Sequence, residues 1–337
     1  MSAGAASASL PALAWRRLRR DRVGVASLAV VLLFLAMAVA SSAGWIAGGW
    51  SKEVGVSYAP PVFLGPDAAA ESGQDEATAG RTIADAGVAD PLAEDLAQLR
   101  KGLTGAAPEA RSATLAFGGD LWGRDVLQKA IKGTETSLLV GLAAALFAVV
   151  LGTLLGAQAG YYGGRVDDCL NWLYSIFTSI PYLLLVLAVA AVLNQKGTTT
   201  VILILGLTGW TGTFRLVRAE YIKHKVREYV RAADAIGASD ARRIFVHILP
   251  NASHVVLVQL SLHVVLFIKS EVILSFLGFG VGVDTVSWGS MLAEAQNELL
   301  LGKWWQLVAA TAAMALLVTA FSLFTDALRD ALDPRIG

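Results

Sequence analysis

The sequence predicts an all-α membrane protein with six transmembrane helices, a long loop after the first helix and a basic helical loop between the fourth and fifth. Three observations lead to this fold class. Of the 337 residues, 55% are hydrophobic and only 16% are charged, whereas a soluble domain carries about 25% charged residues. Six apolar stretches reach or approach the roughly 20 residues that a crossing helix needs. Lysine and arginine gather in the segments that six crossings would place on one side.

The six stretches divide the chain into a tail, an anchor helix, a loop and a core. The fourth stretch is the shortest, and it is retained because losing it would move the basic loop to the other side of the membrane. The expected spans are residues 23–44, 137–160, 172–193, 199–214, 254–277 and 305–323. The corresponding regions are the N-terminal tail 1–22, the first helix 23–44, the outer loop 45–136, a five-helix core 137–325 that contains the basic loop 215–251, and the C-terminal tail 326–337.

The distribution of basic residues predicts the orientation. Five arginines lie within residues 16–22, and eight lysines and arginines lie within residues 215–243. The loops after the third and fifth stretches carry one basic residue each, Lys196 and Lys303. By the positive-inside rule, both termini and the loop 215–251 are therefore expected to be cytoplasmic.

The first apolar stretch has two interpretations. Its small residues at 38–40 resemble a signal-peptide cleavage site, which would remove the segment from the mature chain. However, both the charged region before it and the apolar run are longer than in signal peptides. A retained anchor helix is the preferred interpretation.

The outer loop contains two distinct segments. Residues 67–89 are rich in Ala, Gly, Asp and Glu, a composition typical of poor order. Residues 90–103 carry a capping Asp90, a following Pro91 and leucines at helical spacing, so they predict a short amphipathic helix. The loop is interpreted either as a spacer or as a lid or docking surface for an extracytoplasmic partner.

Several chemistries have no motif in the chain. No GxxxxGK[ST] phosphate-binding loop is present, and the GFGVG at 278–282 is not a GxGxxG fingerprint. The single cysteine, Cys169, cannot form an intramolecular disulfide, and the four histidines are too scattered for a metal site. The balanced charge gives no reason to expect a nucleic-acid partner. We therefore expect no catalytic residue, no bound metal and no cofactor in this chain.

Features within the spans suggest packing positions and a possible translocation path. Gly152, Gly156 and Gly160 repeat every four residues, which favours close approach of another helix. Pro181 should kink the third span, with the preceding Thr178 and Ser179 compensating freed carbonyls. Lys269 and Glu271 lie within the fifth span, where charge is costly. Packing and path-lining roles both remain open for them, and the path candidates are Pro181, Lys269 and Glu271.

The loop 215–251 is predicted to form two helices that meet at a glycine. A first helix should run from 215 to 236 and stop at Gly237 in a left-handed conformation. Ser239 or Asp240 can cap a second helix over 241–249, which Pro250 and Asn251 should end. Small side chains around Gly237 would let another surface come close. The alternative is a solvated basic loop that only enforces topology.

This segment resembles the EAA signature of permeases of ATP-binding-cassette (ABC) importers. An alanine pair at 232–233, Gly237 four residues later, and Leu249 with Pro250 twelve and thirteen residues after the glycine match its spacing. Arg231 replaces the leading glutamate of the signature, and His247 replaces its isoleucine. The wider sequence is similar to the dipeptide/oligopeptide permeases, through EYVRAADAIGAS, HILPN, GRDVLQKAIKGTETSLLVGL, SIPYLLL, LSFLGFG, SWGSML and ALRDALDPR. The chain departs from their pattern at Gly119, in the length of the outer loop and in the proline-free VGVDTV.

The resemblance implies a transporter subunit of the inner (plasma) membrane, not an enzyme. Its partners would be a second homologous permease, two ATPase subunits that bind ATP and Mg²⁺, and an extracytoplasmic solute-binding protein. The cargo would be peptides or peptide-like solutes. Related permeases carry nickel chelates or antimicrobial peptides, and a membrane scaffold that works through its outer loop is a further alternative. The implied ATPase-coupling residues are Tyr229, Arg231, Ala232, Ala233, Asp234, Gly237, Ala238, Ser239, Leu249 and Pro250.

Overall fold

The computed structural model describes residues 17–66, 95, 111–282 and 284–332, and its regular structure there is helical. Isolated bridges join the extended segments of 53–61 and 112–125. The expected helix over 90–103 falls outside the described residues, apart from Asp95, as does segment 67–89. In chain order the helices are α2 (Arg22–Ser42), η1 (Val62–Leu64), α5 (Val126–Tyr162), α6 (Gly164–Ser179), α7 (Tyr182–Leu193), α8 (Thr198–Thr208), α9 (Thr211–Lys225), α10 (Glu228–Ala235), α11 (Asp240–Arg242), the π-helix η3 (Arg243–Ile248), α12 (Leu249–Phe276), α13 (Trp288–Leu300) and α14 (Trp305–Leu332).

The number of candidate spans ranges from four to six. Among the described residues, α2, α5, α14 and the continuous helix that ends with α12 are each long and apolar enough to cross a membrane. Two further pairs qualify only when their halves are combined: α6 with α7, bent by 92°, and α8 with α9, bent by 41°. Taking each bent pair as one broken span gives six, which agrees with the number predicted from the sequence.

The third predicted span is broken at Pro181, whereas the sequence suggested a kinked but continuous helix. Ile180 adopts an extended conformation (φ −99°, ψ 131°), as expected for a residue before proline. The hydroxyls of Thr178 and Ser179 donate to the carbonyls of Tyr174 (3.0 Å) and Ile176 (2.8 Å). The predicted compensation is confirmed for Ser179, whose acceptor Ile176 is among the last carbonyls of α6, but not for Thr178, whose acceptor lies within the helix. The proline ends α6, and α7 leaves at nearly a right angle.

Helix α5 is the central helix, and its glycines pack against the backbone of α9. A Cβ added at Gly152 would lie 2.6 Å from the Trp210 carbonyl oxygen. One at Gly156 would lie 2.7 Å from the carbonyl oxygen of Phe214. Because backbone atoms cannot move aside as a side chain can, these positions tolerate only glycine. The predicted packing role of the four-residue repeat is confirmed.

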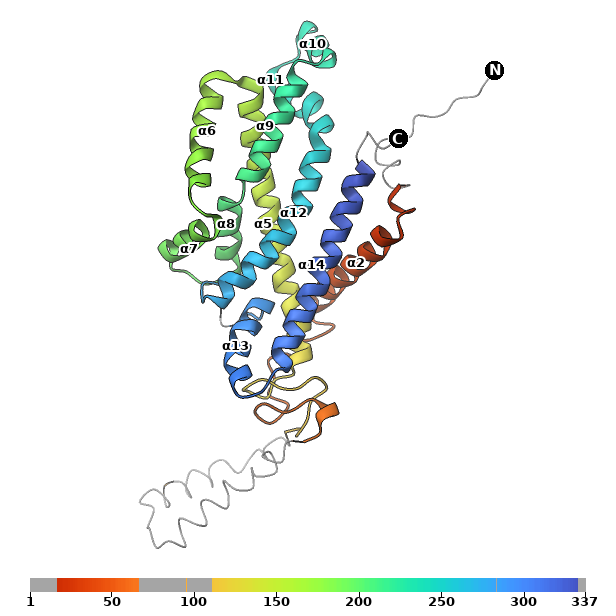
Figure 1. The fold of residues 1–337 in the computed structure, drawn as a ribbon, viewed down its shortest axis with the longest axis vertical. Coiled ribbons are helices and arrows are strands. Elements are labelled where there is room, and N and C mark those ends of the chain that lie inside the picture. Colours follow the sequence, from red (N-terminus) through yellow and green to blue (C-terminus); the bar gives the residue numbers. More distant parts are fainter. Residues whose placement is uncertain (1–16, 67–94, 96–110, 283, 333–337) are drawn as a thin grey trace, which may run out of the picture.

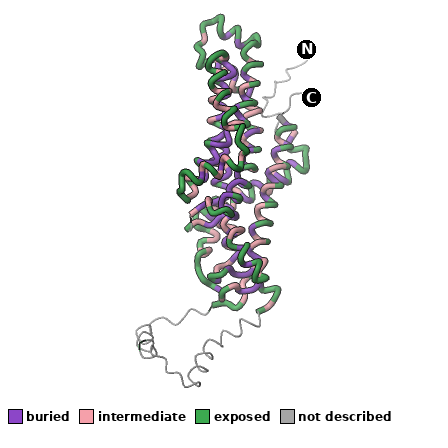
Figure 2. Tube along the Cα trace, turned by 60° about the vertical axis from the view of Figure 1, so that its left-hand side comes forward, coloured by how far each residue is buried: buried purple, intermediate pink, exposed green. Residues whose placement is uncertain are grey.

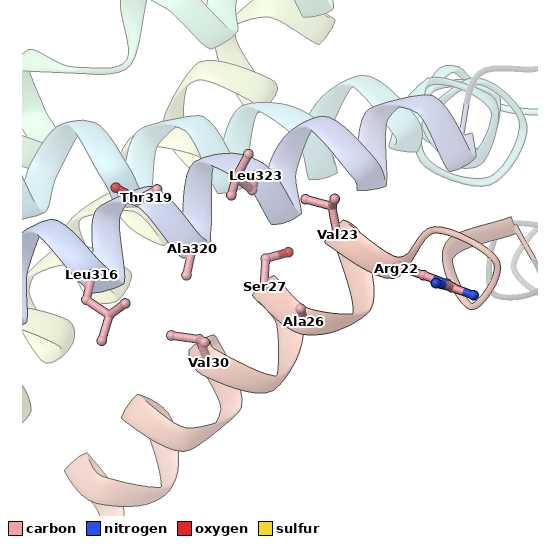
Figure 3. A pocket seen from close by; sticks show the side chains of 9 residues that line it. All are labelled: Arg22, Val23, Ala26, Ser27, Val30, Leu316, Thr319, Ala320 and Leu323. Atoms are coloured by element: carbon pink, nitrogen blue, oxygen red, sulfur yellow. The ribbon is translucent and has the colours of Figure 1, made fainter.

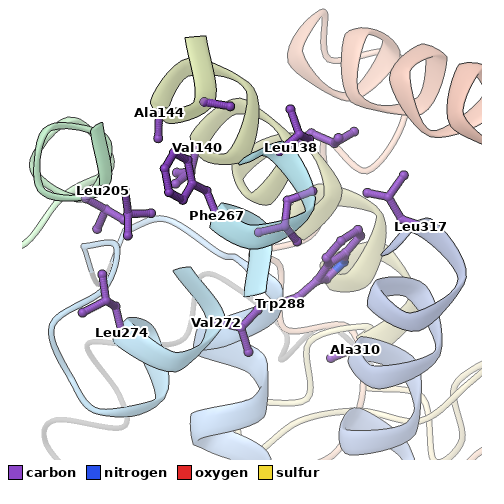
Figure 4. Packing of buried hydrophobic residues seen from close by; sticks show 14 of the residues in the cluster. Leu138, Val140, Ala144, Leu205, Phe267, Val272, Leu274, Trp288, Ala310 and Leu317 are labelled. Carbon is purple, nitrogen blue, oxygen red and sulfur yellow. The ribbon is translucent and has the colours of Figure 1, made fainter. Parts of the chain in front are cut away.

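The main core lies where α5, α8, α12, α13 and α14 meet, and Figure 4 shows its side chains interlocking between these helices. Trp288 at the start of α13 is fully buried, donates from Nε1 to the Ala130 carbonyl (3.0 Å) and packs edge-on against Phe34 of α2. The sequence analysis did not predict α13, which begins at a capping box formed by Ser287 and Ser290. This helix closes one end of the core.

The two ends of the bundle differ in character. Figure 1 shows that α10 forms the tip of the bundle and that the start of α2 and the last turns of α14 lie toward the same end, set back from the tip and to one side; we name this the α10 end. Residues 43–66, residues 111–125 and α13 lie at the opposite end, the loop end. Figure 2 shows buried residues along the centre of the bundle and mostly exposed residues at its α10 tip. The two basic regions of the sequence thus share one end, as six crossings require.

Candidate functional site

The tip of the α10 end is a tight turn closed by Gly237. Gly237 has φ +80°, the left-handed conformation that glycine adopts without steric cost. Its N–H donates to the Asp234 carbonyl (2.8 Å), and the N–H of Ala238 donates to the Ala233 carbonyl (3.0 Å). These two bonds form a Schellman motif. The predicted helix stop at Gly237 is therefore confirmed in conformation and in hydrogen bonding.

The predicted single helix from 215 to 236 is wrong, because the chain breaks between α9 and α10. Helix α9 ends at Lys225, and Arg227 takes an extended conformation (φ −71°, ψ 151°) before α10 begins. The break turns α10 so that Val230 and Ala233 become buried.

The predicted end of the second helix at Pro250 is also wrong. Ser239 caps the helix, accepting from the Arg242 N–H (3.4 Å), as expected. However, α11 passes through the π-helical turn η3 directly into α12. Leu249 donates its N–H to Ile244, five residues back, and the Asn251 side chain donates to the His247 carbonyl (2.7 Å). The widened turn and this side-chain bond accommodate a proline within a helix that runs on.

A small second core holds α10 and η3 against the bundle. Val230 and Ile244 are buried with Val217 and Tyr221 of α9, and the Tyr221 hydroxyl donates to the Ile244 carbonyl (3.1 Å). Ala233 of α10 is buried as well. It therefore faces inward, while its neighbour Ala232 is exposed. Of the alanine pair, one residue anchors the turn and the other contributes to its surface.

A group of charges fixes the angle between the two halves of the loop. Arg243 forms ion pairs with Asp234 of α10 and with Asp240 (2.5 Å). Asp240 also accepts from the Tyr161 hydroxyl at the end of α5 (2.9 Å), and the Arg243 guanidinium lies 5.7 Å from the centre of the Tyr161 ring. These ion pairs position the turn, and the Asp234 and Asp240 side chains remain substantially exposed on it.

The outward surface of the turn is apolar at its tip. Ile236, directly before Gly237, is 85% exposed, and Val226, Tyr229, Phe245 and Val246 are also exposed. The Tyr229 hydroxyl lies 2.8 Å from His224 Nδ1, and desolvation raises the pKa of Tyr229 above its usual value. We define the tip surface as Val226, Tyr229, Ala232, Ile236, Gly237, Phe245 and Val246. An exposed apolar group of this kind on an otherwise charged loop indicates a protein-binding site.

Sequence reasoning missed the outward role of Ile236. The break before α10 and the glycine turn after it leave this side chain pointing outward. The other predicted residues in the loop lie as follows: Arg231 and Ser239 are exposed, Ala238 and Leu249 are half-buried, and Pro250 is exposed. The outward position of Ile236 could have been predicted from its place immediately before the glycine that ends the helix.

The three translocation-path candidates are not brought together. Pro181 is exposed at the break between α6 and α7, and Lys269 is exposed on α12. Glu271 is fully buried and accepts from the hydroxyls of Ser137 (3.1 Å) and Ser275 (2.7 Å). It therefore lies in the contact between α5 and α12, while Lys269 lies on another face of the same helix.

The loop end contains a charge network that the sequence analysis did not find. Lys129 is buried and donates to Asp120 (2.7 Å), to Glu294 of α13 (2.6 Å) and to Gln306 of α14 (3.1 Å). Burial opposes ionisation of Asp120, but Lys129 and Arg124 hold its pKa below the usual range. This network fastens the loop of residues 111–125 to α13 and α14. Its members are too far apart in the sequence to be recognised as a group.

Within the described residues, no group of three or more His, Cys, Asp or Glu side chains could hold a metal ion. Cys169 is exposed and unpaired with another cysteine. Near the charge network, a cavity of about 450 Å³ is bordered by Trp50, Trp122 and Glu294 among others. The tip surface, with its exposed apolar side chains, is therefore the strongest candidate site among the described residues.

Comparison with known proteins defines the class of this molecule. Residues 128–337 match the family described as the binding-protein-dependent transport system inner membrane component. Residues 9–61 match the N-terminal transmembrane domain of oligopeptide transport permease C. The first match covers more than half of the chain, so the chain belongs to the family of binding-protein-dependent inner membrane components. It is a multi-pass permease of the inner membrane.

Within that family, the chain is an ABC importer permease of the dipeptide/oligopeptide type. The dipeptide transport system permease protein DppC of Bacillus subtilis is 39% identical over 220 residues, which span 65% of this chain and 68% of the relative. The oligopeptide transport system permease protein OppC of the same species is 36% identical over 220 residues, 65% of this chain and 72% of the relative. Among solved structures, a chain of the inward-facing MetNI methionine ABC transporter matches with a TM-score of 0.49 and 15% identity, over 61% of this chain and 96% of that one. The resemblance inferred from the motifs is confirmed by the family and the two relatives.

Proposed function

We propose that this permease subunit couples ATP hydrolysis by partner ATPases to the import of peptides or peptide-like solutes, and that the tip surface is the contact with an ATPase. The observation that carries the proposal is Ile236, an apolar side chain that is 85% exposed on a turn fixed from within. A turn held by the Schellman motif and the Arg243 ion pairs can transmit a displacement, because it does not yield locally when pushed.

The connection of the turn to the bundle supports a mechanical role. The turn continues through η3 into α12 without a break, and its inner residues contact α5 and α9. A force applied at Ile236 therefore reaches three long helices at once. Movement of these helices would switch the translocation path between inward-facing and outward-facing states, with no chemistry performed by the turn itself.

The proposal includes an orientation and a set of partners. The α10 end and both termini are cytoplasmic, which agrees with the basic residues gathered there. A second homologous permease completes the path, two ATPases bind ATP and Mg²⁺, and a solute-binding protein delivers the cargo at the loop end. Peptides are the proposed cargo because the relatives are named as dipeptide and oligopeptide permeases. The proposed path residues are Pro181, Lys269 and Glu271.

Ile236→Asp tests the proposed contact. The charge would have to be buried against the ATPase, so we expect the ATPases to be lost from the affinity-purified complex and uptake to fall with them. Leu300→Asp is the matched control, because Leu300 is also 85% exposed but lies at the end of α13, away from the tip. It should leave ATPase recovery unchanged. Full recovery of the ATPases with Ile236→Asp would refute the contact.

A further inference from the structure

An apolar groove runs between α2 and α14 near the α10 end (Figure 3). Its volume is about 360 Å³. Its floor and walls are mainly small and aliphatic side chains, and the hydroxyl of Ser27 is used within α2, donating to the Gly24 carbonyl (2.9 Å). The lining residues are Arg22, Val23, Ala26, Ser27, Val30, Leu316, Thr319, Ala320 and Leu323.

The groove lies between two candidate membrane spans that the rest of the described chain leaves largely uncovered. Both α2 and α14 are candidate membrane spans, and only 22% of the most apolar window of each is buried within the chain. An apolar depression between two such helices is accessible to hydrocarbon from the bilayer. Its width is set by close packing at one side, where a Cβ at Gly24 would lie 2.8 Å from Ala327 Cβ. A narrow apolar groove of this form suits one extended acyl chain.

The mouth of the groove is basic. Arg22 is exposed, and Figure 3 shows its side chain extending past the first turn of α2, away from the apolar lining. Arg19 and Arg20, just before it, are exposed as well. The acidic side chains nearby, Asp21 and Asp330, border a separate cavity together with Arg17 and Leu18. Among the residues that line the groove, Arg22 is the charged one, so the groove offers an apolar body and a cationic end.

We propose that this groove binds one anionic phospholipid, with an acyl chain between α2 and α14 and the phosphate on Arg22. A lipid matches both features, since its acyl chain is apolar and its headgroup negative. The site is separate from the proposed ATPase contact, and transport does not require it in principle. Loss of lipid binding and loss of ATPase coupling can therefore be distinguished experimentally.

The test uses the purified transporter complex in nanodiscs and two photoactivatable lipids. One is phosphatidylglycerol and the other phosphatidylcholine, each with the same diazirine-bearing acyl chain. Mass spectrometry of proteolytic fragments then locates the label. We expect phosphatidylglycerol to label α2 and α14 at the groove more strongly than phosphatidylcholine does. Removing one basic group near a membrane surface changes attraction for anionic lipid about fivefold.

Five substitutions test whether the labelling depends on the groove: two that should weaken or block it, one conservative replacement that should retain it, and two controls outside the groove. Arg22→Gln should lower phosphatidylglycerol labelling about fivefold, Arg22→Lys should retain most of it, and Ala26→Phe should block labelling by both lipids. The controls are Ala29→Phe, an exposed α2 position outside the groove, and Arg165→Gln, an exposed arginine on α6; neither should change labelling. Equal labelling by the two lipids would overturn the proposal. So would a wild-type complex whose groove takes no label, as expected if a helix of the second permease filled it.

Discussion

Replacing Gly237 with alanine should loosen the tip surface through backbone strain alone. Gly237 has φ +80°, and nothing lies within 4 Å of the position that a Cβ would occupy. A non-glycine residue in this conformation costs about 1–2 kcal/mol. This strain destabilises the closed turn, in which the carbonyls of Asp234 and Ala233 accept the two closing hydrogen bonds. Because 1–2 kcal/mol changes a population about 5–30-fold, the turn should open more often by that factor.

Hydrogen–deuterium exchange over residues 228–240 of the purified transporter measures this opening. Gly237→Ala should speed exchange within the range given above, and Gly237→Asn should have a smaller effect because asparagine tolerates the conformation better. Gly212→Ala is the control: Gly212 is within α9, and the nearest atom to its added Cβ is 3.8 Å away. Unchanged exchange in Gly237→Ala, or an equal increase in the control, would refute the role of the left-handed glycine. Uptake driven by ATP should fall with the loosened turn.

Two further predictions concern the loop end and the outer loop. Burial raises the pKa of Glu298 to about 7, so between pH 4.5 and about 7 the folded chain holds a proton that the unfolded chain releases. The stability associated with this proton is present below pH 4.5 and lost as pH rises through 7. Glu298→Gln should therefore raise Tm at about pH 8 more than at about pH 5; a Tm difference independent of pH would contradict this. Deleting residues 67–89 should leave uptake intact. If the deletion abolished uptake, that result would favour the interpretation of the chain as a scaffold that works through this loop.

Local structure could be predicted from the sequence where a single residue type determines the backbone conformation. Gly237 could be assigned a left-handed stop because no other residue adopts that conformation so readily, and the structure confirms it. Gly152 and Gly156 could be assigned to close helix packing by their spacing alone. The broken third span was partly predictable, since Pro181 removes a hydrogen bond and restricts Ile180, but its 92° bend depends on how α7 packs.

The errors arose where contacts distant in sequence override local signals. Pro250 looked like a helix end, yet the π-turn before it and the side chain of Asn251 satisfy the backbone. Ala233 was expected among the small side chains open to another surface, yet it is buried in α10. The position of α10 depends on Val230 packing with residues of α9, whereas the π-turn and Asn251 flank Pro250 directly, so the error there lay in reading the proline alone.

The charge network at the loop end shows the same limitation. Lys129, Asp120, Glu294 and Gln306 come from three separate parts of the chain and meet only in the fold. Lys129 is the fourth residue of α5, and its sequence position alone suggests a lysine exposed at the membrane boundary. Its full burial is understandable only when its partners are known, since a buried ammonium group requires compensating charge.

The most direct test of the proposed function is photo-cross-linking from position 236 in the assembled transporter. Benzoylphenylalanine placed at Ile236 should form an adduct with a partner chain that carries the GxxxxGK[ST] motif, because this side chain is the most exposed apolar group of the tip surface. The same reporter at Leu300 should give no such adduct. Cross-linking to the ATPase from position 300 but not from position 236 would contradict the assignment of the tip surface as the coupling contact.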